Sequence, residues 1–288
     1  MLWTQRVLNG LGQIMLQENI LCGFLFLSGL FAAHYIYGLA ALTAVLCGTL
    51  TAHLLKYDKK ETDSGLYGFS PALVGVVLVF LFKPVLLTWI LLLVGSSAAA
   101  VLQHYFIKRN IPAYTFPFIL VSWILIFLIR NFIDLPAAEI QSNDFLKWPA
   151  DYLLIGTKSY GQVIFQSSTL SGILFFLGVL ISAPLAGIYA LLAAFLCSFL
   201  ALIFGQAADS VWMGIYGFNP VLTAIVFAGP KIKDAFWVLL AVILTLFIQI
   251  ILIETAVLNS FGGVLTFPFV AGTWLTLIIK SRLKTAED

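Results

Sequence analysis

The sequence predicts an all-α integral membrane protein of ten transmembrane helices in two inverted five-helix repeats, with two short re-entrant pore helices and interrupted fifth and tenth helices. The first reason is composition. Apolar residues make up 61% of the 288 residues and charged residues 10%, against about 45–50% and about 25% in a water-soluble domain. The second reason is that three motifs occur twice in the same order. Soluble and nucleic-acid-binding domains are excluded, so no nucleic-acid partner is expected.

Eight stretches without Asp, Glu, Lys or Arg supply the predicted spans. They are residues 19–55, 64–82, 84–107, 110–129, 159–208, 210–230, 235–253 and 255–279. A bilayer-spanning helix needs about 20 apolar residues, so six stretches hold one span each. The other two are long enough for two spans, with breaks at His34–Gly38 and at Pro184. Ten helices are expected because, in lipid, a helix satisfies its own backbone hydrogen bonds.

The distribution of the 15 basic residues predicts that both termini are cytoplasmic. Eleven fall on one side of a ten-span chain, namely Arg6, Lys56, Lys59, Lys60, Lys108, Arg109, Lys231, Lys233, Lys280, Arg282 and Lys284. The other side receives Lys83, Arg130, Lys147 and Lys158. Because Lys and Arg accumulate in cytoplasmic loops, we expect a multi-pass protein of the cytoplasmic (inner) membrane, surrounded by lipid. The N-terminal segment has no uninterrupted apolar core, so no cleavable signal peptide is expected.

An internal repeat divides the chain. GQIMLQENILCG from Gly12 matches GQVIFQSSTLSG 149 residues later, and GLYGFSPAL from Gly65 matches GIYGFNPVL at the same offset. The TFPF segment from Thr115 recurs 151 residues later. Three ordered motifs at nearly one offset indicate a duplicated architecture.

The duplication predicts three parts. Residues 1–133 form the first five-helix repeat, 134–157 an extracytoplasmic linker, and 158–288 the second repeat with a cytoplasmic tail. Because five is odd, the second repeat must begin on the opposite side of the membrane, so the repeats are inverted. Substrate sites in inverted-repeat transporters lie at the repeat interface, where helices are interrupted.

Two kinds of interruption are expected in each repeat. The TFPF segments lie inside apolar stretches, where Pro removes a helix hydrogen bond. Segments 9–18 and 158–167 precede the first span of each half and are too short and polar to cross. We interpret these two segments as re-entrant pore helices, because irregular backbone at membrane depth is tolerated only inside protein or along a cavity.

The duplicated polar residues are the candidate substrate-binding residues. Gln13 and Gln162 belong to the short helices, and their amides offer donors and an acceptor to a neutral, flat, polar solute. Facing solvent or loops is the alternative for these glutamines. Thr115 and Thr266 precede the Phe-Pro breaks, where a hydroxyl can line a pore or bond back to its own helix. The duplication favours the lining role.

The three motifs together resemble the urea transporter family over about residues 9–280. The resemblance implies a homotrimer, a pore in every protomer, and passive, channel-like transport of urea with no cofactor and no metal. It implies that Gln13 and Gln162 lie at the two ends of a filter and that Thr115 and Thr266 lie at its centre. It also implies that the apolar walls of the filter are Leu16, Phe165, Phe69 and Phe218.

Two other functions stay open at this point. An ion-coupled secondary transporter of another small polar metabolite fits the same repeat and would use ionisable groups at membrane depth. Glu18 and Glu254 are the candidates for that role. A membrane protein with a structural role and no pore is the third possibility. No nucleotide-binding or nucleophile motif occurs, so an enzyme is not expected.

The two repeats differ where their motifs are otherwise alike. Ser70 occupies the position that Asn219 has in the second half. Ser167 and Ser168 replace Glu18 and Asn19. The two mouths of the predicted pore therefore need not bind solute equally.

Overall fold

The fold, a computed structural model, is described for residues 2–139 and 151–287 and is all-α over those ranges. The first half contains α1 (Trp3–Gly12), the 3-10 helix η1 (Gln13–Met15), α2 (Ile20–Ala33), α3 (Tyr35–Leu54), α4 (Lys59–Asp63), α5 (Phe69–Leu81), α6 (Leu86–Lys108) and α7 (Phe116–Phe132). The second half contains α8 (Asp151–Gln162), α9 (Thr169–Ser182), α10 (Pro184–Ile203), α11 (Ala208–Trp212), α12 (Phe218–Phe227), α13 (Ile232–Glu254), the 3-10 helix η2 (Asn259–Phe261) and α14 (Phe267–Glu287).

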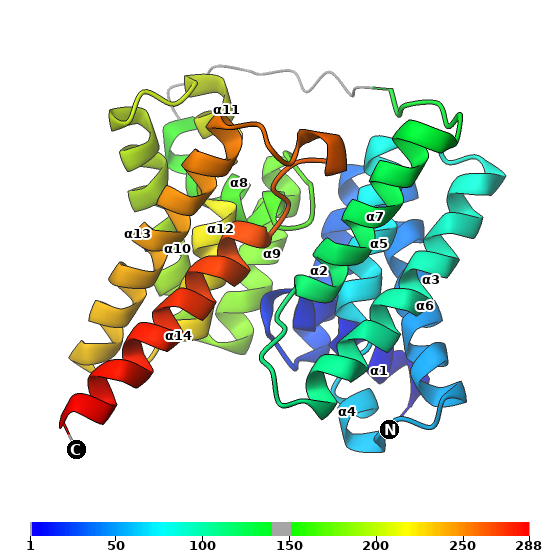
Figure 1. Cartoon of the computed structure of the whole chain (residues 1–288), viewed down its shortest axis with the longest axis horizontal. Coiled ribbons are helices and arrows are strands. Elements are labelled where there is room, and N and C mark those ends of the chain that lie inside the picture. Colours follow the sequence, from blue (N-terminus) through cyan, green and yellow to red (C-terminus); the bar gives the residue numbers. More distant parts are fainter. Residues whose placement is uncertain (1, 140–150, 288) are drawn as a thin grey trace.

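The two halves contain the same order of α-helices and lie side by side (Figure 1). Helices α2, α3, α4 and α5 begin 149 residues before α9, α10, α11 and α12, respectively. The offset becomes 146 for α6 and α13 and 151 for α7 and α14. Helix α4 lies at the end of the bundle that carries both termini, whereas α11 lies at the opposite end (Figure 1). Corresponding short helices thus occupy opposite ends of the molecule.

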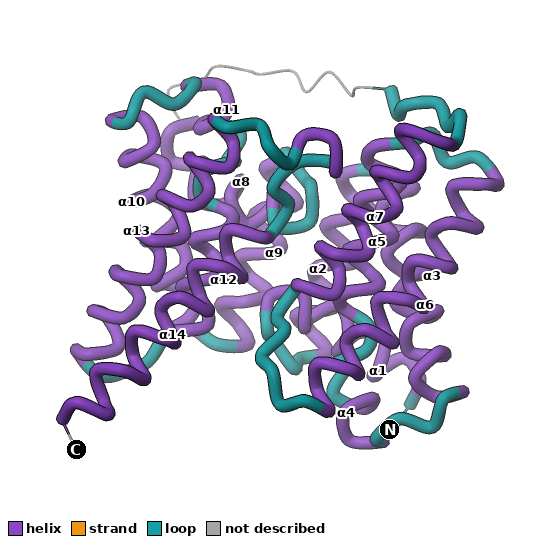
Figure 2. The backbone as a smooth tube through the Cα atoms, viewed as in Figure 1, coloured by secondary structure: helices purple, strands orange, loops and turns teal. Residues whose placement is uncertain are grey.

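Each predicted span contains one apolar helix, but the helices differ in length. Among the described residues, α3, α6, α10 and α13 are long and apolar enough to cross a membrane, and α1–η1 with α2 form a fifth candidate bent by 78°. Helices α5, α7, α9 and α12 are apolar but shorter. Over the described residues the structure confirms an all-α protein with several apolar helices suited to a membrane (Figure 2). The ten crossings in two inverted repeats stay a prediction.

The short helices α5 and α12 form the interior of their halves. Eleven of the 13 residues of α5 are buried, as are eight of the 10 residues of α12. The longer helix α6 instead exposes large apolar side chains, among them Ile90, Leu93 and Val94. Because protein surrounds α5 and α12, these two helices do not need the length of a helix that faces lipid along its whole course.

The seam between the halves is built from α2 and α9. The Phe26 and Phe175 rings meet there at 5.2 Å between centroids. A Cβ on Gly29 would lie 2.5 Å from the Phe175 ring, and one on Gly178 would lie 2.9 Å from the Phe26 ring, so a side chain at either position would displace the facing ring. Ser171 Oγ donates to the Gly29 carbonyl at 2.8 Å. The seam therefore joins matched residues of the two repeats.

The two short helices begin earlier than predicted. Helix α1 starts at Trp3 rather than near residue 9, and α8 starts at Asp151, within the segment predicted as linker. Residues 140–150 of that predicted linker lie outside the described part of the chain. The first part of α1 contains one charged residue, Arg6. In the structure, the Arg6 guanidinium pairs with the Asp63 carboxylate at 2.6 Å, so this charge does not interrupt the helix.

Candidate functional site

A pair of buried threonines lies where the two halves meet. Thr115 Oγ1 and Thr266 Oγ1 are 2.7 Å apart, although 151 residues separate them in sequence. Their exposed fractions are 3% and 1%. Each threonine comes directly before the first residue of its helix, α7 or α14. The structure therefore brings the two predicted central hydroxyls into direct contact.

The backbone before each threonine is strained in the same way. Tyr114 has φ of 48° and Leu265 has φ of 47°, in a region that residues with a side chain adopt only at a cost. After this turn the helix starts at Phe116, and Pro117 lies in its first turn, where a missing N–H breaks no helix hydrogen bond. The TFPF motif therefore starts a helix after an interruption instead of kinking a continuous one.

Gln13 and Gln162 make matched hydrogen bonds. Gln13 Nε2 donates to the Ser64 carbonyl at 3.0 Å, and Gln162 Nε2 donates to the Met213 carbonyl at the same distance. Both acceptors lie in the segments that lead into α5 and α12. These bonds occupy the amide nitrogens and leave the amide oxygens as acceptors. Neither glutamine hydrogen-bonds to Thr115 in the described structure, so the predicted site residues do not form one cluster.

The four predicted wall residues lie at strained or terminal positions. Leu16 and Phe165 have φ of 63° and 59°. Phe69 and Phe218 are the first residues of α5 and α12. The Phe165 ring packs against Phe80 of the first half, with centroids 5.5 Å apart, so this wall residue crosses the seam between the repeats.

Gln17 and Gln166 shape the ends of the short helices. Gln17 Nε2 donates to the Met15 carbonyl at 2.8 Å, and Gln166 Nε2 donates to the Ile164 carbonyl at the same distance. Both glutamines are buried. Each amide therefore closes the turn around the left-handed residue that precedes it.

The sequence prediction missed a buried polar network in the second half. Asn219 Nδ2 donates to Gln249 Oε1 at 3.2 Å and to the Leu265 carbonyl at 3.3 Å. Its Oδ1 accepts from Phe269 N at 3.2 Å. This network ties α12 and α13 to the turn that carries Thr266. The signal was present in the sequence, because Gln249 matches Gln103, but at an offset of 146 rather than 149.

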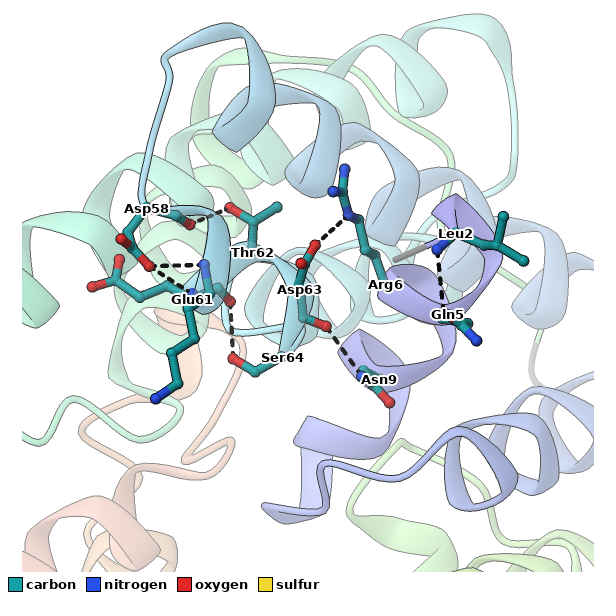
Figure 3. A network of polar contacts seen from close by, with 10 residues as sticks. Leu2, Gln5, Arg6, Asn9, Asp58, Glu61, Thr62, Asp63 and Ser64 are labelled. Atoms are coloured by element: carbon teal, nitrogen blue, oxygen red, sulfur yellow. Dashed lines mark hydrogen bonds and ion pairs between the residues drawn. The ribbon is translucent and has the colours of Figure 1, made fainter.

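Charged side chains hold α1 to α4 at one end of the molecule (Figure 3). Beside the pair between Arg6 and Asp63, Asn9 Nδ2 donates to the Asp63 carbonyl at 3.1 Å. Asp58 Oδ1 caps α4 by accepting from Lys60 N and Glu61 N at 2.8 and 3.0 Å. These contacts fix the short helix that carries Gln13 against the loop that precedes α5.

The candidate site is electrically neutral. Its eight predicted residues are Gln, Thr, Leu and Phe, and the two carboxylates considered for ion coupling, Glu18 and Glu254, are both exposed. Glu254 Oε1 accepts from Gln206 Nε2 at 2.8 Å. No group of three His, Cys, Asp or Glu side chains among the described residues could hold a metal ion. The predicted site residues therefore supply hydroxyl, amide and apolar groups and no charge.

A duplicated all-α membrane architecture, with broken helices that meet at neutral polar groups, defines the class as a membrane transport protein. The family model described as "Urea transporter" matches residues 4–281. The chain belongs to the urea transporter family, a family of transporters.

The chain is also similar to curated mammalian proteins. It is 24% identical over 238 residues to "Urea transporter 1" of Rattus norvegicus and to that of Mus musculus, and 25% identical to that of Capra hircus. Each match covers 77% of this chain and 62% of the relative. The chain thus spans less than two thirds of the length of these relatives.

Proposed function

We propose that the protein transports urea passively across the cytoplasmic membrane, through a channel at the interface of two inverted repeats. The observation that carries this proposal is the contact between Thr115 and Thr266, in which two broken helices from the two repeats meet at a buried pair of hydroxyls. The family match supports urea as the solute.

In this proposal, Gln13 lies at the cytoplasmic end of the channel, Gln162 at the outer end, and the threonine pair between them. Two features support this order. Helices α4 and α11, which the glutamines adjoin through the Ser64 and Met213 carbonyls, lie at opposite ends of the bundle (Figure 1). The excess of Lys and Arg on the side of the α4 end supports a cytoplasmic position for that end.

The chemistry of the lining suits urea. Each threonine hydroxyl has one donor and two acceptor lone pairs. Because one hydroxyl donates to the other, the pair keeps one O–H for the urea oxygen and several lone pairs for the amide hydrogens of urea. The proposed walls Leu16, Phe165, Phe69 and Phe218 are flat or apolar and offer nothing to a hydrated ion. Passive conduction requires binding strong enough for entry and weak enough for release, and neutral hydrogen bonds meet that requirement.

We further propose the domain boundaries 1–133, 134–157 and 158–288, both termini in the cytoplasm, and a homotrimer embedded in lipid. The resemblance to the family supports the trimer. Large apolar side chains are exposed on the outer surface of the bundle, such as Leu192, Phe199 and Ile251. They support contact with lipid tails or neighbouring protomers.

The decisive experiment is stopped-flow light scattering on proteoliposomes given a urea gradient. Thr115→Val with Thr266→Val should slow urea by on the order of thirtyfold, because the variant loses two hydrogen bonds to urea, each worth about 1 kcal/mol, and about 1.4 kcal/mol is tenfold. Thr115→Ser with Thr266→Ser keeps both hydroxyls and is the matched control. Unchanged permeation in the valine variant would show that the pore lies elsewhere.

Ion coupling is the competing function. As an ion-coupled transporter of another small polar metabolite, the protein would accumulate that solute against its gradient when a sodium or proton gradient is imposed, and Glu18→Gln or Glu254→Gln would abolish the accumulation. Passive transport predicts a urea flux that is the same with and without the sodium and proton gradients. Both carboxylates are exposed on the surface of the bundle, whereas ionisable groups within membrane spans almost always face the bundle interior or a water-filled cavity.

A further inference from the structure

Two tryptophans make reciprocal hydrogen bonds across the two repeats. Trp123 Nε1, on α7, donates to the Gly263 carbonyl at 3.0 Å. Trp274 Nε1, on α14, donates to the Pro112 carbonyl at 2.8 Å. Both donors and both acceptors correspond at the same offset, 151 residues. Each repeat therefore holds the loop of the other.

The same tryptophans pack against the residues next to the threonine pair. The Trp123 ring lies 5.3 Å from the Phe267 ring, and the Trp274 ring lies 5.4 Å from the Phe116 ring, measured between centroids. Phe116 and Phe267 directly follow Thr115 and Thr266 in the sequence. Each indole thus contacts the other repeat at two points: the loop carbonyl that accepts its hydrogen bond, and the phenylalanine ring at the start of the helix.

The two loops that accept these hydrogen bonds contain strained backbone, which the surrounding structure must hold in place. Their last residues before the threonines, Tyr114 and Leu265, have positive φ, and strained backbone persists only where the surroundings hold it. The Gly263 carbonyl, which accepts from Trp123, lies two residues before Leu265. The hydrogen bond between the two hydroxyls is a single neutral bond and is too weak to set this geometry alone.

We propose that Trp123 and Trp274 are positioning residues, forming a reciprocal clamp that sets the separation of the Thr115 and Thr266 hydroxyls. The clamp thereby fixes the hydroxyl pair, whose oxygens are in contact at 2.7 Å, as one polar edge beside which an amide passes, and this favours urea over bulkier N-substituted ureas. This inference rests on the proposed function, because the position of the hydroxyl pair selects among solutes only if solutes pass beside the pair.

The first test measures selectivity. In proteoliposomes, Trp123→Phe with Trp274→Phe keeps the rings and removes both N–H donors. The ratio of urea to N,N′-dimethylurea permeability should fall at least threefold in the double variant. It should fall by a smaller factor in each single variant. Trp89→Phe is the matched control, because the Trp89 indole, also half-buried, has no hydrogen-bond acceptor among the described residues. A variant that only folds poorly would lose both fluxes in proportion and keep the ratio, and an unchanged ratio would overturn the clamp.

The second test does not depend on urea. Thr115→Cys with Thr266→Cys, in a chain whose Cys22, Cys47 and Cys197 are changed to Ala, should form a disulfide under mild oxidation, because the two hydroxyl oxygens are 2.7 Å apart and a disulfide requires close side chains. Adding both Trp→Phe changes should slow the cross-link at least threefold, whereas adding Trp89→Phe should not.

The two tests separate the clamp from the proposed function. Wild-type vesicles without urea flux would refute urea transport, while the cross-linking rate would still decide whether the tryptophans position the threonines. Equal cross-linking rates with and without the indole donors would refute the clamp even if urea flux were large.

Discussion

The two repeats anchor the same tyrosine in different ways. Tyr67 OH donates to Glu61 Oε2 at 2.5 Å and lies 2.8 Å from His104 Nδ1. In the second repeat, Tyr216 OH donates to Gln206 Oε1 at 2.6 Å. The first anchor is a carboxylate and an imidazole, whereas the second is a neutral amide. Both tyrosines hold the Tyr-Gly-Phe turn that leads into α5 or α12. The hydrogen-bond partner of the tyrosine thus differs between the repeats, whereas its structural role is the same.

The interior shows the opposite asymmetry. Asn219 makes three hydrogen bonds in the second repeat, whereas Ser70 makes one contact of 3.5 Å to Gln103 Oε1. The first repeat therefore has its stronger hydrogen bonds at its end of the bundle, around Tyr67, and only a weak one in its interior. The second repeat has three hydrogen bonds in its interior, at Asn219. A duplicated fold can thus keep its geometry while the energetic support moves from one position to another.

The largest expected effect comes from giving the second repeat the serine of the first. Asn219→Ser leaves Gln249 Oε1, the Leu265 carbonyl and Phe269 N without their partner, and a buried unpaired polar group costs about 1–3 kcal/mol. We expect a loss of about 3 kcal/mol in the free energy of unfolding, measured as a lower Tm in detergent.

Ser70→Ala is the control for this change, because it removes only the long contact to Gln103. We expect a loss below about 1 kcal/mol. Equal destabilisation by the two variants would contradict the inferred difference between the two interiors.

Removing the tyrosine hydroxyls should lower the free energy of unfolding by less than Asn219→Ser does. Here the first repeat should lose more than the second. Tyr67→Phe removes a hydrogen bond to a carboxylate, for which we expect about 2 kcal/mol, since bonds to charged groups are worth about 1.5–3 kcal/mol. Tyr216→Phe removes a bond to an amide and should cost about 1 kcal/mol. Thermal unfolding of both single variants and of the double variant measures the difference. A larger effect at Tyr216 would refute the comparison.

The sequence predicted the repeat well because the duplicated motifs contain residues with special backbone demands. Gly65 and Gly214 have φ of 85° and 83°, and a side chain at either would meet backbone of the short helix within 2.5 Å. Such positions tolerate few residues, so they stay recognisable in both copies. Leu16 and Phe165 also share a left-handed backbone, although their side chains differ.

What the sequence could not predict are contacts that require both repeats in place. The contact between Thr115 and Thr266 joins residues 151 positions apart, and periodicity within either helix contains no information about it. The match of Gln103 with Gln249 was missed for a simpler reason. Helix α12 is three residues shorter than α5, which shifts the offset from 149 to 146, and the longer segment containing η2 then raises it to 151.

The smallest predicted effect concerns the caps of α4 and α11. Asp58 and Ala207 occupy the same capping position with nearly the same backbone, φ −53° and ψ 132° against φ −55° and ψ 121°. Only Asp58 has a side chain that can accept from the first N–H groups of its helix. We expect Asp58→Ala to lower the Tm slightly and Ala207→Asp to raise it slightly, because an aspartate cap pairs N–H groups that the helix leaves unpaired.

The effect of Asp58 should depend on pH. The hydrogen bond from Glu61 N, as the largest cause, holds the pKa of the Asp58 carboxyl below its usual value. A carboxyl whose pKa is lower in the folded state contributes stability above the pKa of the unfolded chain, and that contribution disappears as the pH falls through the folded value. The Tm difference between wild type and Asp58→Ala should therefore be constant near neutral pH and shrink below about pH 4. Ala207→Asp should acquire the same pH dependence at the other end of the molecule, and a gain in Tm that persisted at pH 3 would show that the new carboxylate does not act as a cap.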